Sequence, residues 1–271
     1  MGTERIGRLS RGSGELAYTV TGEGPLVVCA PGMGDLRSTY RHLVPPLVAA
    51  GYRVATLDLR GHGDSDTTFD RFDDEALADD LSALIDALGG DPAVVVGNSM
   101  AAGAAVILAA RRPEQVRGLV LLGPFVRNPP VNPLMLALFR LLTAPWWAAA
   151  VWGAYLPTLY AGARPEDFEA HRAEVVAALR RPGHARAFSR TTRTTHAPAE
   201  AALAGVSAPS LAVMGALDPD FADPAAEAAW IAERLGSEVV MVPDCGHYPQ
   251  AQAPGITADA VLRFLEGLDR A

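Results

Sequence analysis

Ser99 is the first residue whose position suggests chemistry, because an apolar run ends just before it and a helical pattern begins just after it. The stretch over residues 94–106 reads VVVGNSMAAGAAV. Gly97 and Ala101, two positions before and two after the serine, are small enough to let a strand and a helix approach closely. The tip of such a turn lies at the carboxyl end of a sheet, where ligands bind in open α/β folds. The spacing therefore makes Ser99 a candidate nucleophile.

A nucleophilic serine needs hydrogen-bond donors for the negative charge that develops on the substrate oxygen. Residues 27–35 read VVCAPGMGD, so glycines follow a second apolar run directly. Glycine allows the backbone to turn an N–H toward a bound oxygen. The sequence predicts an oxyanion hole made by the backbone N–H of Met33 and that of Met100, the first residue after the nucleophile.

The general base expected beside this serine is a histidine late in the chain. His247 lies in MVPDCGHYPQ, directly after an apolar run and before the last predicted helix. A loop at a strand end lets an imidazole reach Ser99, so His247 is the predicted base. His62, in the glycine-rich stretch DLRGHGDSD, is predicted to be structural. The remaining histidines, which lack a strand-end setting of this kind, are His42, His171, His184 and His196.

A carboxylate must orient the imidazole and stabilise its charged form. Asp218 is the first carboxylate after another apolar run, in LAVMGALDPDF, and precedes His247 by 29 residues. We therefore predict Asp218 as the acid of a catalytic triad. The alternatives are Asp220 and Asp223 nearby and, with a weaker case, Asp244.

These residues need a scaffold, and the hydrophobic pattern supplies one. Short apolar runs alternate with helical patterns, and most of the runs are continuous, as in strands covered on both faces. This order predicts a mostly parallel sheet with right-handed crossovers. The predicted strands are residues 16–21, 26–30, 53–59, 93–98, 118–122, 210–216 and 238–242, and the predicted helices are residues 38–49, 74–88, 100–111, 225–235 and 256–268.

The alternation stops over about 70 residues, too many for an ordinary loop. We predict a core made of residues 1–126 and 198–271 and a helical cap insertion at residues 127–197. The uncharged run at 141–163 is interrupted by Pro145 and Pro157, so no membrane span is expected. Residues that could line an apolar pocket, or pack the cap on the core instead, are Trp146, Trp147, Trp152, Tyr155 and Tyr248.

Composition excludes several function classes. A net charge of −8 and a pI near 5.2 argue against nucleic acid or an anionic membrane as partner. The 23 basic residues are all arginine, so the chain has no lysine. Schiff-base catalysis, covalent attachment of pyridoxal phosphate and a P-loop each require a lysine and are therefore excluded. We expect no cofactor and no metal, a small molecule as the only partner, and a monomer or homodimer. The N-terminal residues show no apolar secretion signal, so a cytoplasmic location is expected.

Taken together, these motifs resemble the α/β-hydrolase superfamily over nearly the whole chain. The matching pieces are PGMG (31–34), DLRGHGDSD (58–66), GNSMA (97–101), GALDPD (215–220) and GHYPQ (246–250). The resemblance implies an eight-stranded, mostly parallel sheet with antiparallel first strands and a helical cap. It also implies the same triad and oxyanion hole. Two positions depart from the superfamily: Pro31 replaces the usual histidine before Gly32, and Ala101 replaces the last glycine of the turn.

The resemblance implies acyl transfer, with a carboxylic ester as the simplest substrate class. An alternative is cleavage of a carbon–carbon bond in a meta-ring-cleavage product, because GNSM resembles the turn of such hydrolases. Those enzymes tend to have tryptophan after the Gly-His pair, whereas this chain has Tyr248. A second alternative is a catalytically silent, ligand-binding member. Because the nucleophile is serine and not aspartate, haloalkane dehalogenase and epoxide hydrolase activities are not expected.

Overall fold

The fold is built on one eight-stranded sheet, seen in a computed structural model that describes residues 4–130 and 132–270. The strand order is β1-β2-β4-β3-β5-β6-β7-β8. β2 pairs antiparallel with β1 and β4, and every other pair is parallel, which confirms the predicted fold class. The strands are β1 (Arg5–Arg11), β2 (Gly14–Thr21), β3 (Leu26–Ala30), β4 (Arg53–Leu57), β5 (Ala93–Asn98), β6 (Val116–Leu122), β7 (Ser210–Gly215) and β8 (Glu238–Val242).

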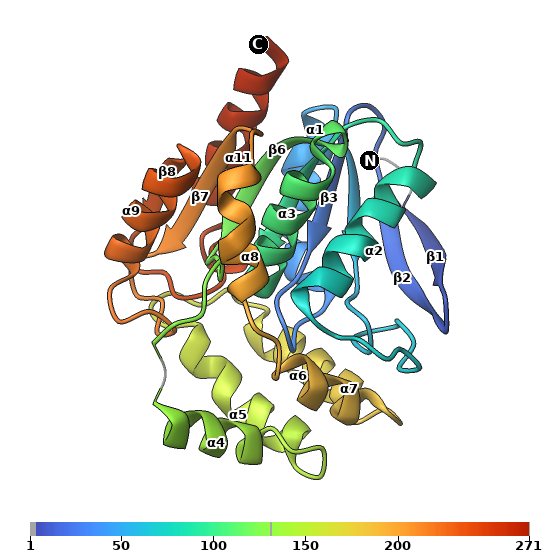
Figure 1. Ribbon diagram of the computed structural model, residues 1–271, viewed down its shortest axis with the longest axis vertical. Coiled ribbons are helices and arrows are strands. Elements are labelled where there is room, and N and C mark those ends of the chain that lie inside the picture. Colours follow the sequence, from blue (N-terminus) through green and yellow to red (C-terminus); the bar gives the residue numbers. More distant parts are fainter. Residues whose placement is uncertain (1–3, 131, 271) are drawn as a thin grey trace.

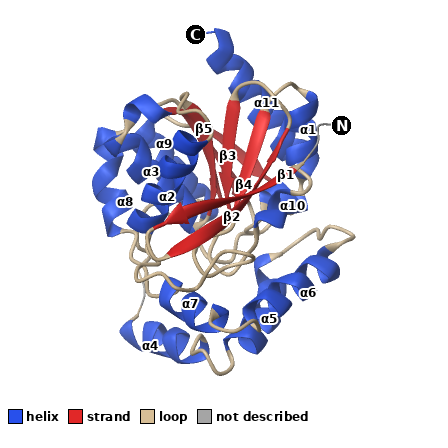
Figure 2. Cartoon of the chain, turned by 90° about the vertical axis from the view of Figure 1, so that its right-hand side faces the viewer, coloured by secondary structure: helices blue, strands red, loops and turns tan. Residues whose placement is uncertain are grey.

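Helices cover both faces of this sheet (Figure 1; Figure 2). One face carries α2 (Asp74–Ala87), α3 (Met100–Arg111), α8 (Ala197–Ala202) and α9 (Pro224–Leu235). The other carries α1 (Val44–Ala49), α10 (Pro249–Gln252) and α11 (Pro254–Arg270). The 3₁₀ turns are η1 (Arg37–Tyr40), η2 (Pro113–Gln115) and η3 (Leu203–Gly205).

Four further helices lie together at one end of the molecule, beyond the ends of the strands (Figure 1). They are α4 (Pro133–Leu142), α5 (Ala148–Leu159), α6 (Phe168–Leu179) and α7 (His184–Thr191). The division at residues 127 and 197 stays a prediction, and positions 1–3, 131 and 271 of the predicted ranges lie outside the described residues. Within the described part of the chain, no helix combines the length and apolar character needed to cross a membrane.

Two hydrophobic cores lie on opposite faces of the sheet, because successive residues of a strand point to opposite sides. In β3, Val28 and Ala30 pack toward the layer of α2 and α3, whereas Val27 and Cys29 pack toward α1 and α11. All five residues of β3 are buried, and so are all six of β5. This double burial explains why these strands have continuous apolar sequences.

The predicted helix over residues 38–49 is wrong, because the structure divides it into η1 and α1. Pro45 and Pro46 have no N–H to donate, so a continuous helix cannot pass through them. Both prolines lie in the first turn of α1, where that donor has no partner in any case. β4 ends at Leu57, two residues before the predicted end, and β1 has no counterpart among the strands predicted from the apolar runs.

The passage from β5 to α3 requires a glycine at position 97. A Cβ atom there would overlap the Ala101 carbonyl and would lie 2.6 Å from the backbone N of Ala102. Backbone atoms of a helix cannot rotate away as a flexible side chain can. The strand and helix that flank Ser99 are therefore as close as two backbones can pack.

We expect Gly97→Ala to destabilise the protein by about 2–3 kcal/mol, which lowers Tm by roughly 5–10 °C, because of this overlap. Gly267→Ala is the matched control, since a Cβ at that exposed position in α11 meets no atom within 4 Å. Alanine there raises stability by about 0.5–1 kcal/mol through its higher helix propensity. Thermal unfolding of the two variants measures both effects, and equal Tm values would contradict the close-packing argument.

Candidate active site

Ser99 lies at the tip of a strained turn between β5 and α3. Its backbone angles, φ of 57° and ψ of −125°, belong to a region that residues other than glycine rarely adopt. Ser99 N–H donates to the Leu122 carbonyl at 2.9 Å, and Asn98 Nδ2 donates to the same carbonyl at 2.9 Å. These bonds to β6 hold the turn, so Ser99 projects from the carboxyl end of the sheet in a fixed backbone conformation.

His247 and Asp218 come together at the same end of the sheet. Asp218 follows β7, His247 follows β8, and His247 Nδ1 donates to Asp218 Oδ2 at 2.7 Å. Both side chains are buried. The His247 backbone is bonded on two sides, since its N–H donates to Leu159 O at 2.8 Å and its carbonyl accepts from Asn98 Nδ2 at 3.2 Å. The imidazole is thus fixed with Nε2 as its remaining acceptor.

The alternative carboxylates are placed differently. Asp220 Oδ2 is 3.7 Å from His247 Nδ1, and the Tyr155 hydroxyl donates to Asp220 Oδ1 at 3.2 Å. Asp223 caps α9, where its Oδ1 accepts from the Ala226 N–H at 2.9 Å. Asp244 is the only non-glycine residue besides Ser99 with positive φ within residues 4–130 and 132–270. Among these acids, only Asp218 is hydrogen-bonded to the imidazole.

Asp218, Asp220 and His247 also form a group that could hold a metal ion, with one ligand atom from each within 4.8 Å of the others. The 2.7 Å hydrogen bond, however, requires the proton on His247 Nδ1, because an ionised carboxylate can only accept. A protonated nitrogen has no lone pair for a metal. The geometry therefore fits an acid–base pair better than a metal site.

Charge around His247 makes it a strong base. Burial disfavours the imidazolium form, but Asp218, with Asp220 and Asp35 further away, outweighs burial and raises the pKa of His247 to about 9. Burial raises the pKa of the Asp220 carboxyl as well. The neutral imidazole, which alone can accept a proton, therefore predominates only in alkaline solution.

The loop after β3 runs beside Ser99. A Cβ on Gly32 would lie 2.7 Å from Ser99 Cβ, so the loop backbone is in close contact with the serine. Within the described residues, neither the Met33 N–H nor the Met100 N–H has a hydrogen-bond acceptor. The same residues contain no hydrogen bond between Ser99 Oγ and the His247 ring. Met33 follows Gly32 and Met100 follows Ser99, so both N–H groups lie next to the contact between the loop and the serine.

The predicted pocket residues fall into two groups. Trp152 and Tyr248 are buried, and the Tyr248 ring lies 5.2 Å from the His247 ring, edge to face. Tyr155 reaches the site through its bond to Asp220. Trp146 and Trp147 instead lie on the outer surface, 84% and 41% exposed. Two of the five predicted residues thus contact His247 or its neighbour Asp220, Trp152 is buried, and the other two are exposed.

Outside the predicted triad, three further histidines, His62, His171 and His196, are buried and hydrogen-bonded. His62 Nε2 accepts the Gly34 N–H at 3.0 Å, and His171 Nε2 donates to Asp35 Oδ1 at 2.7 Å. His196 is paired in the same way with Asp74, through Nδ1, at 2.7 Å. His171 and His196 are separated from their partners by more than 120 residues, so no local sequence signal announces these pairs.

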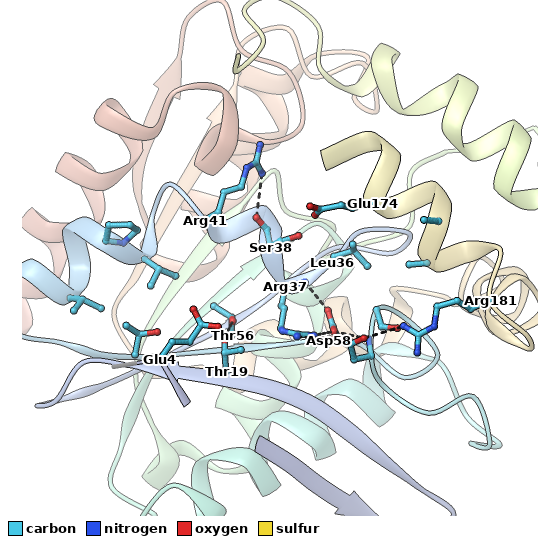
Figure 3. A pocket seen from close by; sticks show the side chains of 18 of the residues that line it. Glu4, Thr19, Leu36, Arg37, Ser38, Arg41, Thr56, Asp58, Glu174 and Arg181 are labelled. Carbon is cyan, nitrogen blue, oxygen red and sulfur yellow. Dashed lines mark hydrogen bonds and ion pairs between the residues drawn. The ribbon is translucent and has the colours of Figure 1, made fainter. Parts of the chain in front are cut away.

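A cavity of about 1180 Å³ opens between the first strands, η1, α1 and α6 (Figure 3). No residue of the predicted triad lines it. Its three arginines are already paired with carboxylates, so it offers an anion no unpaired cation among the described residues. The pairs are Arg37 with Asp58 and Asp64, Arg41 with Asp167, and Arg181 with Asp64.

The strand order of the sheet and the strained turn at Ser99 together indicate one class of protein. Comparison with known sequences identifies that class. The sequence profile of the alpha/beta hydrolase fold matches residues 25–254. The chain belongs to the α/β hydrolase fold family.

Individual relatives within this family catalyse different reactions. A 2-hydroxy-6-oxononadienedioate/2-hydroxy-6-oxononatrienedioate hydrolase of Paraburkholderia xenovorans is 39% identical over 128 residues, which are 45% of this chain and only 44% of that protein. A 2-(acetamidomethylene)succinate hydrolase of Mesorhizobium japonicum is 28% identical over 253 residues, 90% of this chain and 89% of the relative. A thermophilic esterase from Thermogutta terrifontis has a similar fold, with a TM-score of 0.83 and 24% identity over 97% of this chain and 99% of the esterase.

We expect the rate at which a fluorophosphonate probe labels Ser99 to rise with pH toward a midpoint near the His247 pKa of about 9. Below that pH the imidazole is protonated and cannot accept the serine proton. Asp220→Asn removes a negative charge that raises this pKa, so its midpoint moves to lower pH. Asp223→Asn is the control, because asparagine also caps a helix and Asp223 does not act on His247. A wild-type midpoint near 6.5, the usual histidine value, would contradict this electrostatic account.

Proposed function

We propose that this protein is a serine hydrolase that cleaves a carboxylic ester of a small to medium, largely apolar substrate. The observation that carries the proposal is the 2.7 Å bond from His247 to Asp218, at the same sheet end as the strained Ser99 turn. A serine, a buried histidine and a buried carboxylate in this arrangement provide what acyl transfer needs.

In the proposed reaction, Ser99 Oγ attacks the ester carbonyl while His247 Nε2 accepts the serine proton. Asp218 stabilises the resulting imidazolium, and the N–H groups of Met33 and Met100 bind the oxyanion. His247 then gives the proton to the alkoxide oxygen of the departing alcohol, and the acyl group remains bonded to Ser99 Oγ. Water, activated by the same histidine, releases the acid and restores the free serine.

Epoxide opening is not part of the proposal, although relatives include an epoxide hydrolase of Mycobacterium tuberculosis, 34% identical over 100 residues. Attack of Ser99 on an epoxide carbon would form an ether. Water does not hydrolyse an ether as it hydrolyses an ester, so the serine would stay blocked. A serine nucleophile therefore favours carbonyl substrates.

Carbon–carbon bond hydrolysis is the second candidate, favoured by the similarity to the Paraburkholderia xenovorans hydrolase, whose named substrates are dioates. The charge near the predicted base favours an ester instead. Against the effect of burial, Asp218 and, to a smaller extent, Asp220 and Asp35 raise the pKa of His247, so these carboxylates place negative potential at the site. A doubly charged substrate would be repelled there, whereas a neutral ester would not.

We expect the wild-type protein to hydrolyse p-nitrophenyl esters from acetate to dodecanoate, and Ser99→Ala to lose at least about 10⁴-fold in kcat. The preferred chain length measures the size of the acyl pocket. Ser207→Ala, at an exposed loop position, is the matched control and retains full activity.

The other outcomes separate the candidate functions. Turnover that survives in Ser99→Ala would rule out the serine mechanism. Fluorophosphonate labelling of Ser99 without turnover of any ester would favour the carbon–carbon candidate. Absence of both labelling and turnover would indicate the third candidate, a silent, ligand-binding member of the family.

A further inference from the structure

The loop that carries the Met33 N–H is fixed through its backbone. Asp35 N–H donates to the Gly32 carbonyl at 3.3 Å. Because a trans peptide is planar, the position of the Gly32 carbonyl fixes the Met33 N–H in the opposite direction. Any movement of residues 32–35 therefore changes the aim of this proposed oxyanion donor.

Gly34, at the bend of this loop, is bonded at both of its backbone groups. Its N–H donates to His62 Nε2 at 3.0 Å, and its carbonyl accepts from Trp152 Nε1 at 2.7 Å. Its φ of +73° suits glycine, and a Cβ there would also collide with the Trp152 and Phe188 rings. One bond comes from the core and the other from α5.

Asp35, the next residue, is held from α6. His171 Nε2 donates to its Oδ1 at 2.7 Å, and the Leu36 N–H donates to the same oxygen at 2.8 Å. Its Oδ2 is buried without a partner among the described residues. Burial acts to raise the pKa of Asp35, but His171, together with the Leu36 N–H and Thr39, outweighs burial and keeps the pKa below its usual value. His171 is therefore the only side chain outside the loop that is hydrogen-bonded to this buried carboxylate among the described residues.

From these contacts we infer that Trp152 and His171 are positioning residues that hold the Pro31–Asp35 loop in the shape of an oxyanion hole. The inference rests on the proposed hydrolase function. Pro31 has no side-chain donor with which to brace the loop from within. The helices α5 and α6 provide that bracing from outside, so the oxyanion donor is aligned only when they are seated on the core.

The test compares Trp152→Phe with the wild type, because phenylalanine keeps an aromatic ring and removes the N–H bond to Gly34. We expect kcat for p-nitrophenyl acetate to fall by about 10–100-fold, with KM changed much less, since the lost alignment acts on the transition state. Trp230→Phe makes the same change in α9, away from the loop, and leaves kcat unaltered.

His171→Leu and His171→Gln test the second contact. Leucine leaves Asp35 without its partner and lowers kcat, whereas the glutamine amide can donate to the carboxylate and restores most of the activity. Gln115→Leu is the control, because it removes the hydrogen bonds to Ser82 and Asp86 that are made by a buried side chain in η2, beyond the end of α3 that is far from Ser99. It lowers Tm as His171→Leu does, but leaves kcat unaltered.

Hydrogen exchange provides a readout that does not depend on any substrate. Loss of either contact is expected to accelerate amide exchange in residues 32–36 and to leave residues 97–106 unchanged. Unaltered kcat and unaltered exchange in Trp152→Phe and His171→Leu would overturn the inference while the hydrolase function stands. A wild type that neither turns over esters nor reacts with fluorophosphonate would refute the proposed function, and the exchange rates would still decide whether these residues hold the loop.

Discussion

The contact between the β5 and α3 backbones is the constraint on which the rest of the structure depends. Because position 97 has no side chain, the two backbones can approach this closely and the chain can reverse within a few residues, with Ser99 at a φ of 57° in the turn. Its side chain can then project only from the carboxyl end of the sheet. The carboxyl ends of parallel strands all lie at one end of the sheet, so the loops after β7 and β8 carry Asp218 and His247 to the end from which Ser99 projects.

Much of the sheet could be predicted because buried parallel strands have simple sequences. The predicted bounds of β3, β5 and β8 agree with the structure, and each is an apolar run between polar or glycine-rich turns. β1 differs, since its sequence RIGRLSR is largely polar and its residues are exposed or half-buried. It is a strand because it pairs with β2 along its whole length, and pairing of this kind has no apolar signature.

The site, like the sheet, has one part that the sequence predicts and another that it does not. Ser99, Asp218 and His247 follow strands, so the order of the chain is enough to suggest that they meet. Trp146 and Trp152 show the limit, because the same residue type six positions apart is 84% exposed in one case and 5% in the other. Which side chains of a segment face the core depends on distant segments, and so does the pairing of His171 with Asp35. Such contacts become visible only when the chain is folded.

The helices outside the sheet take part in the site through backbone contacts as well as side chains. α5 bonds to both halves of the site, since Trp152 donates to the Gly34 carbonyl and the Leu159 carbonyl accepts the His247 N–H. A displacement of α5 therefore acts on the Gly34 loop and on the His247 backbone together. In the proposed function, the alignment of the oxyanion donor and of the base is thus one mechanical property of this helix, which the three reacting residues could not provide alone.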